Sequence, residues 1–286
     1  MLKADQLTLQ HIFVAQRTIS RVAHKTPLTP SDPLSKKLDS AIFFKLETVQ
    51  PTGAFKIRGA ANKILTLTNE EKERGVVTAS TGNHGRAVAY VAQQFGIQAA
   101  VCLSELVPQN KVTALEQLGA EVIVHGQSQD EAELMAQRLV EERGLTMIDP
   151  FDDPFIIAGQ GTIGLELLQQ RPNLDTAVVP LSGGGLIAGI ALALKSANPA
   201  IRLIGVSMTQ APVMAASLDA GKPLQMAEAP TLADSLQGGI GLNNQYTFHL
   251  VGKLVDEVVL VSEAEIGAAM SFALQQHQLG LEGGGA

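Results

Sequence analysis

The stretch GVVTASTGNHGRAVAYVAQQFGIQAAVCL, residues 75–103, decides the fold. Its first apolar run, Gly75 to Ser80, has the length and β-branched content of a buried strand that ends in a loop. Asn83 to Phe95 then places apolar residues on one side at helical spacing, and Gly96 can end the helix. A second apolar run, Ile97 to Leu103, predicts the next strand. Continuous apolar strands separated by a helix indicate a parallel α/β unit.

The same alternation continues through the rest of the chain as far as residue 208. Further helices are predicted at Pro108–Leu118, Asp130–Arg143, Ile157–Gln170 and Gly185–Ala197, and further strands at Glu121–His125, Asp175–Leu181 and Ile201–Met208. Residues 211–241 have weak periodicity, which predicts a helix followed by irregular loops. We therefore predict an α/β fold of two open, mainly parallel twisted sheets with flanking helices. A ligand would sit in the cleft between them, at the C-terminal ends of the strands.

Composition narrows the class of protein. Hydrophobic residues form 45% of the 286 residues, while aromatics form only 4% and Trp is absent, so Ala, Val, Ile and Leu must fill the core. The net charge of -7 gives no support for nucleic-acid binding and would repel an anionic membrane surface. The single cysteine, Cys102, excludes an intrachain disulfide and suits a reducing cytosol. With no signal-peptide pattern and no long apolar span, we expect a cytoplasmic enzyme.

Lys56 has an unusual sequence environment for a lysine. Phe55 and Ile57 flank it, and small residues surround it in Thr52-Gly53-Ala54-Phe55-Lys56-Ile57-Arg58-Gly59-Ala60. A lysine held among apolar groups loses hydration, which favours its neutral amine, and a neutral amine attacks aldehydes to form a Schiff base. The alternative is a surface lysine at the start of a helix.

Two loops follow predicted strands and open predicted helices. Ser80-Thr81-Gly82-Asn83-His84-Gly85 offers free backbone N–H groups that attract a carboxylate, although an ordinary helix cap explains it as well. Ser182-Gly183-Gly184-Gly185-Leu186 can turn backbone N–H groups toward a phosphate. Together, this loop and Lys56 suggest a pyridoxal-phosphate (PLP) enzyme, since PLP carries both an aldehyde and a phosphate.

Other kinds of site find little support. The glycine loop lacks the Gly-Lys-Ser/Thr of a nucleotide-binding P-loop, and its third dinucleotide-fingerprint position is Ala188. Ser182 is not in a G-x-S-x-G setting, so a hydrolase elbow is unsupported. The histidines form no close metal-ligand pair and Cys102 has no cysteine partner, so we expect no metal site. We expect Gly238, in the run Gly-Gly-Ile-Gly, to line the cleft, with a flexible loop as the alternative.

The three motifs, in this order and spacing, resemble the serine/threonine dehydratase group of fold-type-II PLP enzymes, which also contains serine racemase. The resemblance covers nearly the whole chain. It implies a large PLP-binding domain, residues 1–68 and 150–286, and a small domain, residues 69–149, that carries the substrate-carboxylate loop. It also implies a homodimer or a higher homo-oligomer.

The resemblance implies a role for each site residue. Lys56 would bind PLP covalently and then act as the base at the substrate α-carbon, with Phe55 beside the pyridine ring and Asn83 on the cofactor 3′-oxygen. Thr81 would be a catalytic residue on the ring face opposite Lys56. The phosphate would be held by Ser182, Gly183, Gly184, Gly185 and Leu186, and the substrate by Ser80, Thr81, Asn83, His84 and Gly238.

Three features depart from the group. Ser182 stands where the group usually has glycine, and its hydroxyl can add a hydrogen bond to the phosphate. The stretch after Val206, Ser207 to Pro212, lacks the carboxylate with which some relatives bind a divalent cation, so we expect that site to be absent. The group's polar partner for the pyridine nitrogen lies beyond Ala286. Since Leu279 to Ala286 predicts a strand, a glycine turn and the start of a helix, we expect that a C-terminal piece has been lost.

The expected reaction is loss of water from a β-hydroxy amino acid, which gives a 2-oxo acid and ammonia. Residues 80–87 and 234–242 are similar to dehydratases of hydroxyectoine utilisation, so threonine, serine and a hydroxyectoine-derived amino acid are the candidate substrates. A racemase on the same fold is the nearest alternative. A PLP-free regulatory protein that binds a small ligand is a second, and a nicotinamide dehydrogenase is a distant third.

Overall fold

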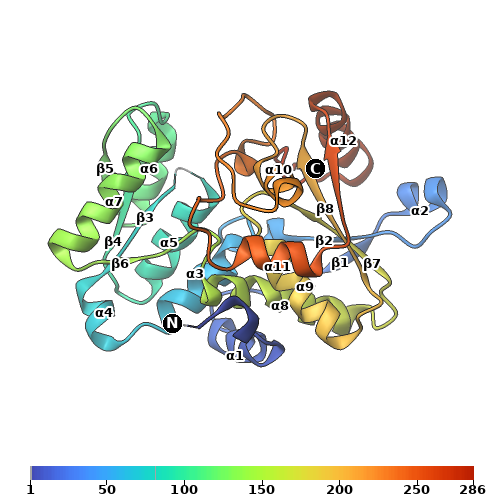
Figure 1. The fold of residues 1–286 in the computed structure, drawn as a ribbon, viewed down its shortest axis with the longest axis horizontal. Coiled ribbons are helices and arrows are strands. Elements are labelled where there is room, and N and C mark those ends of the chain that lie inside the picture. Colours follow the sequence, from blue (N-terminus) through green and yellow to red (C-terminus); the bar gives the residue numbers. More distant parts are fainter. Residues whose placement is uncertain (1, 81) are drawn as a thin grey trace.

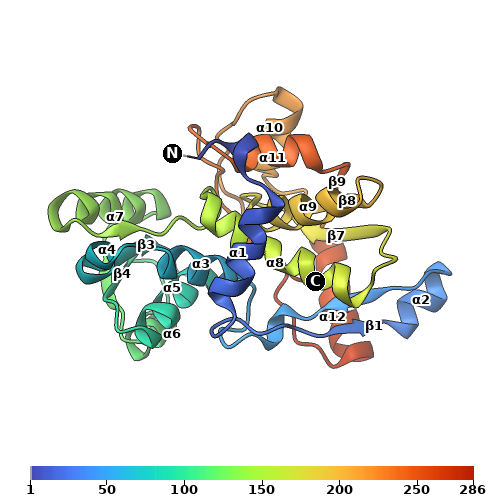
Figure 2. The same cartoon turned by 90° about the horizontal axis from the view of Figure 1, so that it is seen from below.

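The computed structural model describes residues 2–80 and 82–286 (Figures 1 and 2). Two parallel sheets form the framework, as predicted. The four-stranded sheet has the order β5-β4-β3-β6 and lies on the left of Figure 1. Its strands are β3 (Val76–Ala79), β4 (Ala99–Leu103), β5 (Glu121–Val124) and β6 (Thr146–Met147). The three-stranded sheet consists of β7 (Thr176–Pro180), β8 (Arg202–Met208) and β9 (Glu257–Val261), in that order.

Both faces of the four-stranded sheet are buried, which explains why its strands are continuously apolar. On one face, Val77 and Cys102 pack against helix α7 (Gln129–Arg143). On the other face, Val101 packs with helices α5 (Asn83–Gln94) and α6 (Gln109–Gln117). Cys102 is a buried strand residue, as predicted.

Two central helices, α8 (Pro154–Gln170) and α9 (Gly185–Ala197), connect the site to the core of the second sheet. They touch at glycines: a Cβ on Gly189 would come within 2.3 Å of the Ile157 carbonyl oxygen and 2.6 Å of the Gly161 nitrogen. Helix α8 begins three residues before the predicted Ile157. Asp153 explains this, because its carboxylate accepts hydrogen bonds from the backbone N–H groups of the first turn.

The other elements surround this framework. The remaining helices are α1 (Leu9–Ile19), α2 (Asp32–Leu38), α3 (Lys56–Leu65), α4 (Asn69–Arg74), α10 (Val213–Ala220), α11 (Thr247–Leu254) and α12 (Glu263–His277). Short 3-10 helices lie at η1 (Ala4–Gln6), η2 (Glu47–Val49) and η3 (Asp234–Leu236). Strands β1 (Leu28–Pro30) and β2 (Phe43–Lys45) form an antiparallel pair. Among the described residues, no helix has the length and apolar character needed to cross a membrane.

One predicted element is wrong. Residues 279–282, expected to be a strand, have no regular structure, and a turn at residues 283–285 follows them. A segment forms a strand only where a neighbouring strand takes up its backbone hydrogen bonds. The division into residues 1–68 with 150–286 and residues 69–149 stays a prediction, although strands β3 to β6 all fall within residues 76–147.

The contact between α8 and α9 yields a test of packing. Gly189→Ala should destabilise the protein by about 1–3 kcal/mol, because the new methyl group meets backbone atoms that cannot rotate away. Urea denaturation measures this free energy of unfolding.

The matched control is Gly267→Ala in α12, where the nearest side-chain atom lies 3.6 Å from the new Cβ. That change should leave stability unchanged or raise it by up to about 1 kcal/mol, because alanine favours helix more than glycine does. Equal stability of the two variants would contradict the account of the helix contact.

Candidate active site

One cleft brings together every predicted site residue that the structure describes. The lining residues include Phe55, Lys56, Ser80, Asn83, His84, Ser182, Gly183, Gly184, Gly185, Leu186 and Gly238. They come from the start of α3 and the residue before it, from the loops after β3 and β7 with the first turns of α5 and α9, and from the loop after η3. Thr81, predicted to be catalytic, lies outside the described residues.

Lys56 is the first residue of α3, and its half-buried side chain lines the cleft. Its Nζ donates a hydrogen bond to the Pro150 carbonyl oxygen at 2.7 Å and lies 5.5 Å from the centre of the Phe55 ring. Removal of water from the ammonium group lowers the pKa of Lys56 to about 8, although the charges of Asp149 and Glu282 oppose this shift. Near and above that pH, a large fraction of the side chain is a neutral, nucleophilic amine.

A buried ion network holds α3 in place. The Arg58 guanidinium, two residues after Lys56, donates from Nε and Nη2 to Glu47 at 2.8 Å each. It also donates to both carboxylate oxygens of Glu166 on α8, at 2.7 and 3.0 Å. The Lys45 ammonium completes the network on Glu166. The two cations and two anions balance, so burial leaves no uncompensated charge.

The loop after β3 turns sharply into α5. Its backbone folds back so closely that a Cβ on Gly85 would come within 2.2 Å of the Ser80 carbonyl oxygen. Asn83 begins the helix, and its Nδ2 lies 3.1 Å from both carboxylate oxygens of Glu282. The helix N-terminus at Asn83 therefore opens into the cleft, where it favours an anion.

His84 is buried and uncharged. Its Nε2 lies 3.0 Å from the Ile148 carbonyl oxygen, and because a carbonyl can only accept, Nε2 carries the hydrogen. Burial and the nearby Lys56 charge lower the pKa of His84 to about 3. Its Nδ1 has no hydrogen-bond partner among residues 2–80 and 82–286. His84 therefore offers a buried acceptor rather than a positive charge.

The glycine loop after β7 fits a phosphate group. Gly184 has a positive φ of 88°, and a Cβ on Gly183 or Gly185 would overlap Phe151, at 2.4 and 2.8 Å. Among the described residues, the backbone N–H groups of residues 182–187 have no hydrogen-bond acceptor. Unpaired N–H groups at the N-terminus of α9 form an anion site, which the phosphate of PLP can occupy.

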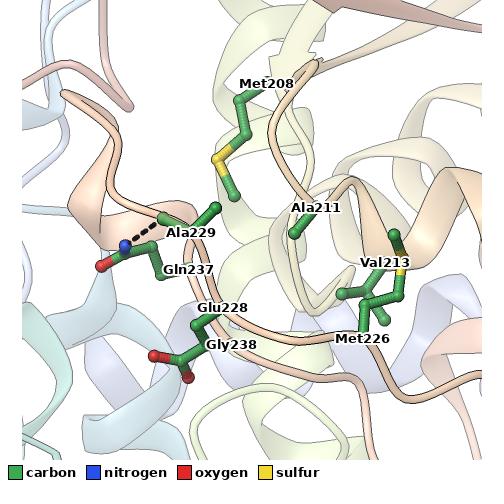
Figure 3. A pocket seen from close by; sticks show the side chains of 8 residues that line it. All are labelled: Met208, Ala211, Val213, Met226, Glu228, Ala229, Gln237 and Gly238. Atoms are coloured by element: carbon green, nitrogen blue, oxygen red, sulfur yellow. Dashed lines mark hydrogen bonds between the residues drawn. The ribbon is translucent and has the colours of Figure 1, made fainter.

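Gly238 lies in a loop that faces the end of β8. Figure 3 shows this region: Gln237 donates from Nε2 to the Ala229 carbonyl oxygen at 2.7 Å, and the Glu228 side chain lies near Gly238. Gly238 has a φ of 101°, which explains why a glycine stands at this turn. In the described part of the chain, no three His, Cys, Asp or Glu side chains group closely enough to hold a metal ion.

Sequence reasoning missed three residues near the predicted ones: Pro150 bonds Lys56, Glu282 bonds Asn83, and Asp149 precedes Pro150 in the lining of the cleft. Asp149 and Pro150 follow β6, whose two residues are too few to show a strand pattern. Glu282 lies in the segment that was expected to be a strand. A useful signal for Asp149 was its place directly after the mostly apolar residues 145–148, at the edge where polar ligand-binding residues gather in parallel sheets.

Comparison with known proteins assigns the family. The model of the family described as pyridoxal-phosphate dependent enzyme matches residues 19–286. The chain belongs to this family. The chain is therefore pyridoxal-phosphate dependent, and its fold is that of the fold-type-II PLP enzymes.

Three relatives illustrate the similarity. A protein of Sinorhizobium fredii that is provisionally named a threonine dehydratase is 48% identical, over 100% of this chain and 86% of its own length. The L-threonine ammonia-lyase of Thermotoga maritima is 46% identical, over 98% of this chain and 69% of its own. The structure of maize serine racemase superposes with a TM-score of 0.93 at 38% identity, and the match covers 98% of this chain and 84% of that one.

The ion network behind Lys56 yields a second test. Glu166→Gln removes one of the two anions and leaves one buried positive charge uncompensated, because only Glu47 still faces Arg58 and Lys45, so the free energy of unfolding should fall by about 3–5 kcal/mol.

The control is the same substitution in the half-exposed pair of Glu121 with Arg143. Glu121→Gln should cost below about 1 kcal/mol, because solvent screens an exposed ion pair. If Glu166→Gln lowered the free energy of unfolding no more than Glu121→Gln does, the network would not hold α3 in place.

Proposed function

We propose that the protein is a PLP-dependent dehydratase, an ammonia-lyase that removes water from a β-hydroxy amino acid such as threonine or serine. The products are a 2-oxo acid and ammonia. The observation that carries the proposal is the position of Lys56, whose amine lies in the same cleft as the unpaired N–H groups of residues 182–187. Relatives named threonine ammonia-lyase support this reaction class.

When bound, PLP supplies an aldehyde that captures amines and a conjugated ring that stabilises negative charge at the substrate α-carbon. The residues of the chain do the rest. The N–H groups of residues 182–187 and the Ser182 hydroxyl would hold the phosphate, and Phe55 would lie beside the cofactor. The Lys56 amine takes the proton from the substrate α-carbon, which requires the neutral form that burial favours.

The substrate carboxylate is proposed to bind at the N-terminus of α5, against Ser80, Asn83 and His84. The helix dipole attracts the carboxylate at this point. Because His84 is neutral, this attraction comes from N–H dipoles rather than from a full charge. Thr81, proposed to face Lys56 across the ring, and Gly238 complete the proposed substrate site.

A finer proposal concerns the substrate. The similarity of residues 80–87 and 234–242 to dehydratases of hydroxyectoine utilisation makes a hydroxyectoine-derived amino acid a candidate beside threonine and serine. Measurement of kcat/KM for the three substrates decides among them. A value for the hydroxyectoine-derived amino acid far below that for threonine would exclude this branch.

We also propose that the enzyme is cytoplasmic, that it forms a homodimer or a larger homo-oligomer, and that its two domains divide at residues 68/69 and 149/150. Light scattering coupled to size-exclusion chromatography measures the oligomeric state. A monomer at micromolar concentration would contradict the second proposal.

Substitution of Lys56 tests the reaction directly. Lys56→Ala should abolish the formation of 2-oxo acid from threonine and serine, because both the covalent anchor and the base at the α-carbon are lost. The assay is coupled reduction of the 2-oxo acid, with circular dichroism as the check on folding. A folded variant with full turnover would overturn the mechanism.

Racemisation is a second candidate function, favoured by the similarity to maize serine racemase. It needs a proton donor on the ring face opposite Lys56, where Thr81 is proposed to lie. Incubation of L-serine with the enzyme, followed by chiral chromatography and a pyruvate assay, separates the two functions. Pyruvate without D-serine is the expected result, and D-serine in excess over pyruvate would favour the racemase.

A further inference from the structure

The C-terminal segment reaches back to the start of α5 and places a carboxylate against a residue of the proposed site. The amide nitrogen of Asn83, Nδ2, lies 3.1 Å from both carboxylate oxygens of Glu282, although 199 residues separate the two in sequence. Both residues line the same cleft as Lys56. The proposed reaction gives Asn83 a binding role and gives Glu282 none, so the contact requires a separate explanation.

The carboxylate decides which way the Asn83 amide faces. A carboxylate only accepts hydrogen bonds, whereas an amide has a donating nitrogen and an accepting oxygen, so the nitrogen is the atom that can face Glu282. Nδ2 carries two hydrogens, and its equal distances from the two oxygens let a single N–H serve both. Among residues 2–80 and 82–286, Nδ2 has no further acceptor. The second N–H therefore remains able to donate to an oxygen atom of a ligand.

Glu282 can fix this amide because its own backbone is anchored. A Cβ on Gly283, the next residue, would come within 2.2 Å of the Leu232 carbonyl oxygen, so the two backbones are in direct contact. The Leu232 N–H in turn donates to the side chain of Glu263, the first residue of α12, at 2.7 Å. The Glu282 carbonyl oxygen accepts from the Gly285 N–H at 3.0 Å. The Glu282 carboxylate therefore extends from a segment with a defined position.

We propose that Glu282 is a positioning residue for Asn83: its carboxylate holds the amide so that the second N–H can donate to the 3′-oxygen of PLP. The proposal rests on the proposed function, in which PLP binds in this cleft, and on Asn83 as the residue that meets the 3′-oxygen. That phenolic oxygen is a stronger acceptor when it is ionised. A reversed amide would present its own oxygen there, and two acceptors repel. Glu282 thus favours the amide orientation that an anionic ligand oxygen requires.

Two direct effects of the Glu282 charge must be separated from this role. The charge would repel an ionised 3′-oxygen, so its removal alone would strengthen PLP binding. It also acts on Lys56: desolvation lowers the pKa of Lys56 to about 8, and the charges of Asp149 and Glu282 oppose that shift. A change at Lys56 would affect any aldehyde that the cleft binds, with or without a 3′-oxygen. Positioning of Asn83 alone predicts a loss of affinity that requires the 3′-oxygen.

The experiment compares two cofactors in the full chain after removal of PLP. Equilibrium dialysis gives dissociation constants for PLP and for 3-deoxypyridoxal 5′-phosphate, which has the same aldehyde and phosphate but no 3′-hydroxyl group. Glu282→Ala should weaken PLP binding about tenfold, the effect of one hydrogen bond to a charged group. The same variant should bind the deoxy analogue as tightly as the wild type does.

Two further variants complete the comparison. Glu282→Gln removes the charge but keeps an oxygen that can accept from Asn83, so its affinity for PLP should stay close to that of the wild type. Asp130→Ala removes an exposed carboxylate from the same cleft and should change neither dissociation constant. Circular dichroism checks the fold. If Glu282→Ala does not fold, Glu282→Ser, whose side chain is also too short to reach the amide, is measured instead.

Equal losses for the two cofactors, no loss for PLP, or a Glu282→Gln variant as weak as Glu282→Ala would overturn the proposal. The binding assay involves no turnover. A wild-type chain that binds PLP but forms no 2-oxo acid would therefore reject the dehydratase and leave the role of Glu282 to the dialysis result. Intact PLP binding and 2-oxo acid formation, with Glu282→Ala unaffected, would reject the role of Glu282 alone.

Discussion

The site depends on one buried interaction, the clamp of the Arg58 guanidinium between the carboxylates of Glu47 and Glu166. Arg58 lies on α3, Glu47 on the short helix η2, and Glu166 on α8, so the clamp ties together three segments that are far apart in sequence. Lys56 stands two residues before Arg58, at the first turn of the same helix. A lysine on a fixed helix loses few alternative conformations when it reaches into the cleft, which is a form of preorganisation.

The clamp also permits a lysine with an unusual proton affinity. A desolvated amine can be maintained only if the surrounding protein does not relax and admit water, and the balanced network resists that relaxation. Around Lys56, the cleft combines N–H dipoles with full negative charges. The N-termini of α5 and α9 favour anions, whereas Asp149 and Glu282 favour a cation at Nζ.

Much of this arrangement was predictable from local pattern. Between residues 75 and 208, the buried strands are mostly apolar and the helices are periodic, so the sequence predicted strands of both sheets, but it did not predict β9, the third strand of the second sheet. Strand β6 could not be predicted, because two residues are too few to show a repeating pattern. The start of α8 was also missed, because it depends on the hydrogen bonds of Asp153 and not on apolar periodicity. The apolar neighbours Phe55 and Ile57 were enough to predict that Lys56 is a desolvated lysine.

The residues that contact Lys56 and Asn83 could not be predicted from local sequence patterns. Its hydrogen-bond acceptor, Pro150, lies 94 residues away in sequence, and Glu282 lies 199 residues from Asn83. No local pattern specifies which of many acidic residues enters the cleft, because tertiary folding alone brings them together. The prediction of a strand from Leu279 and Leu281 was wrong for the same reason, because a strand needs a neighbouring strand that the fold does not place there.

The most direct measurement is the location of the cofactor linkage. The purified protein, incubated with PLP, is reduced with borohydride and digested, and the modified peptide is identified by mass spectrometry. Our account predicts one stoichiometric pyridoxyl group, on Lys56. A stoichiometric label on another lysine, or no label at saturating PLP, would contradict it.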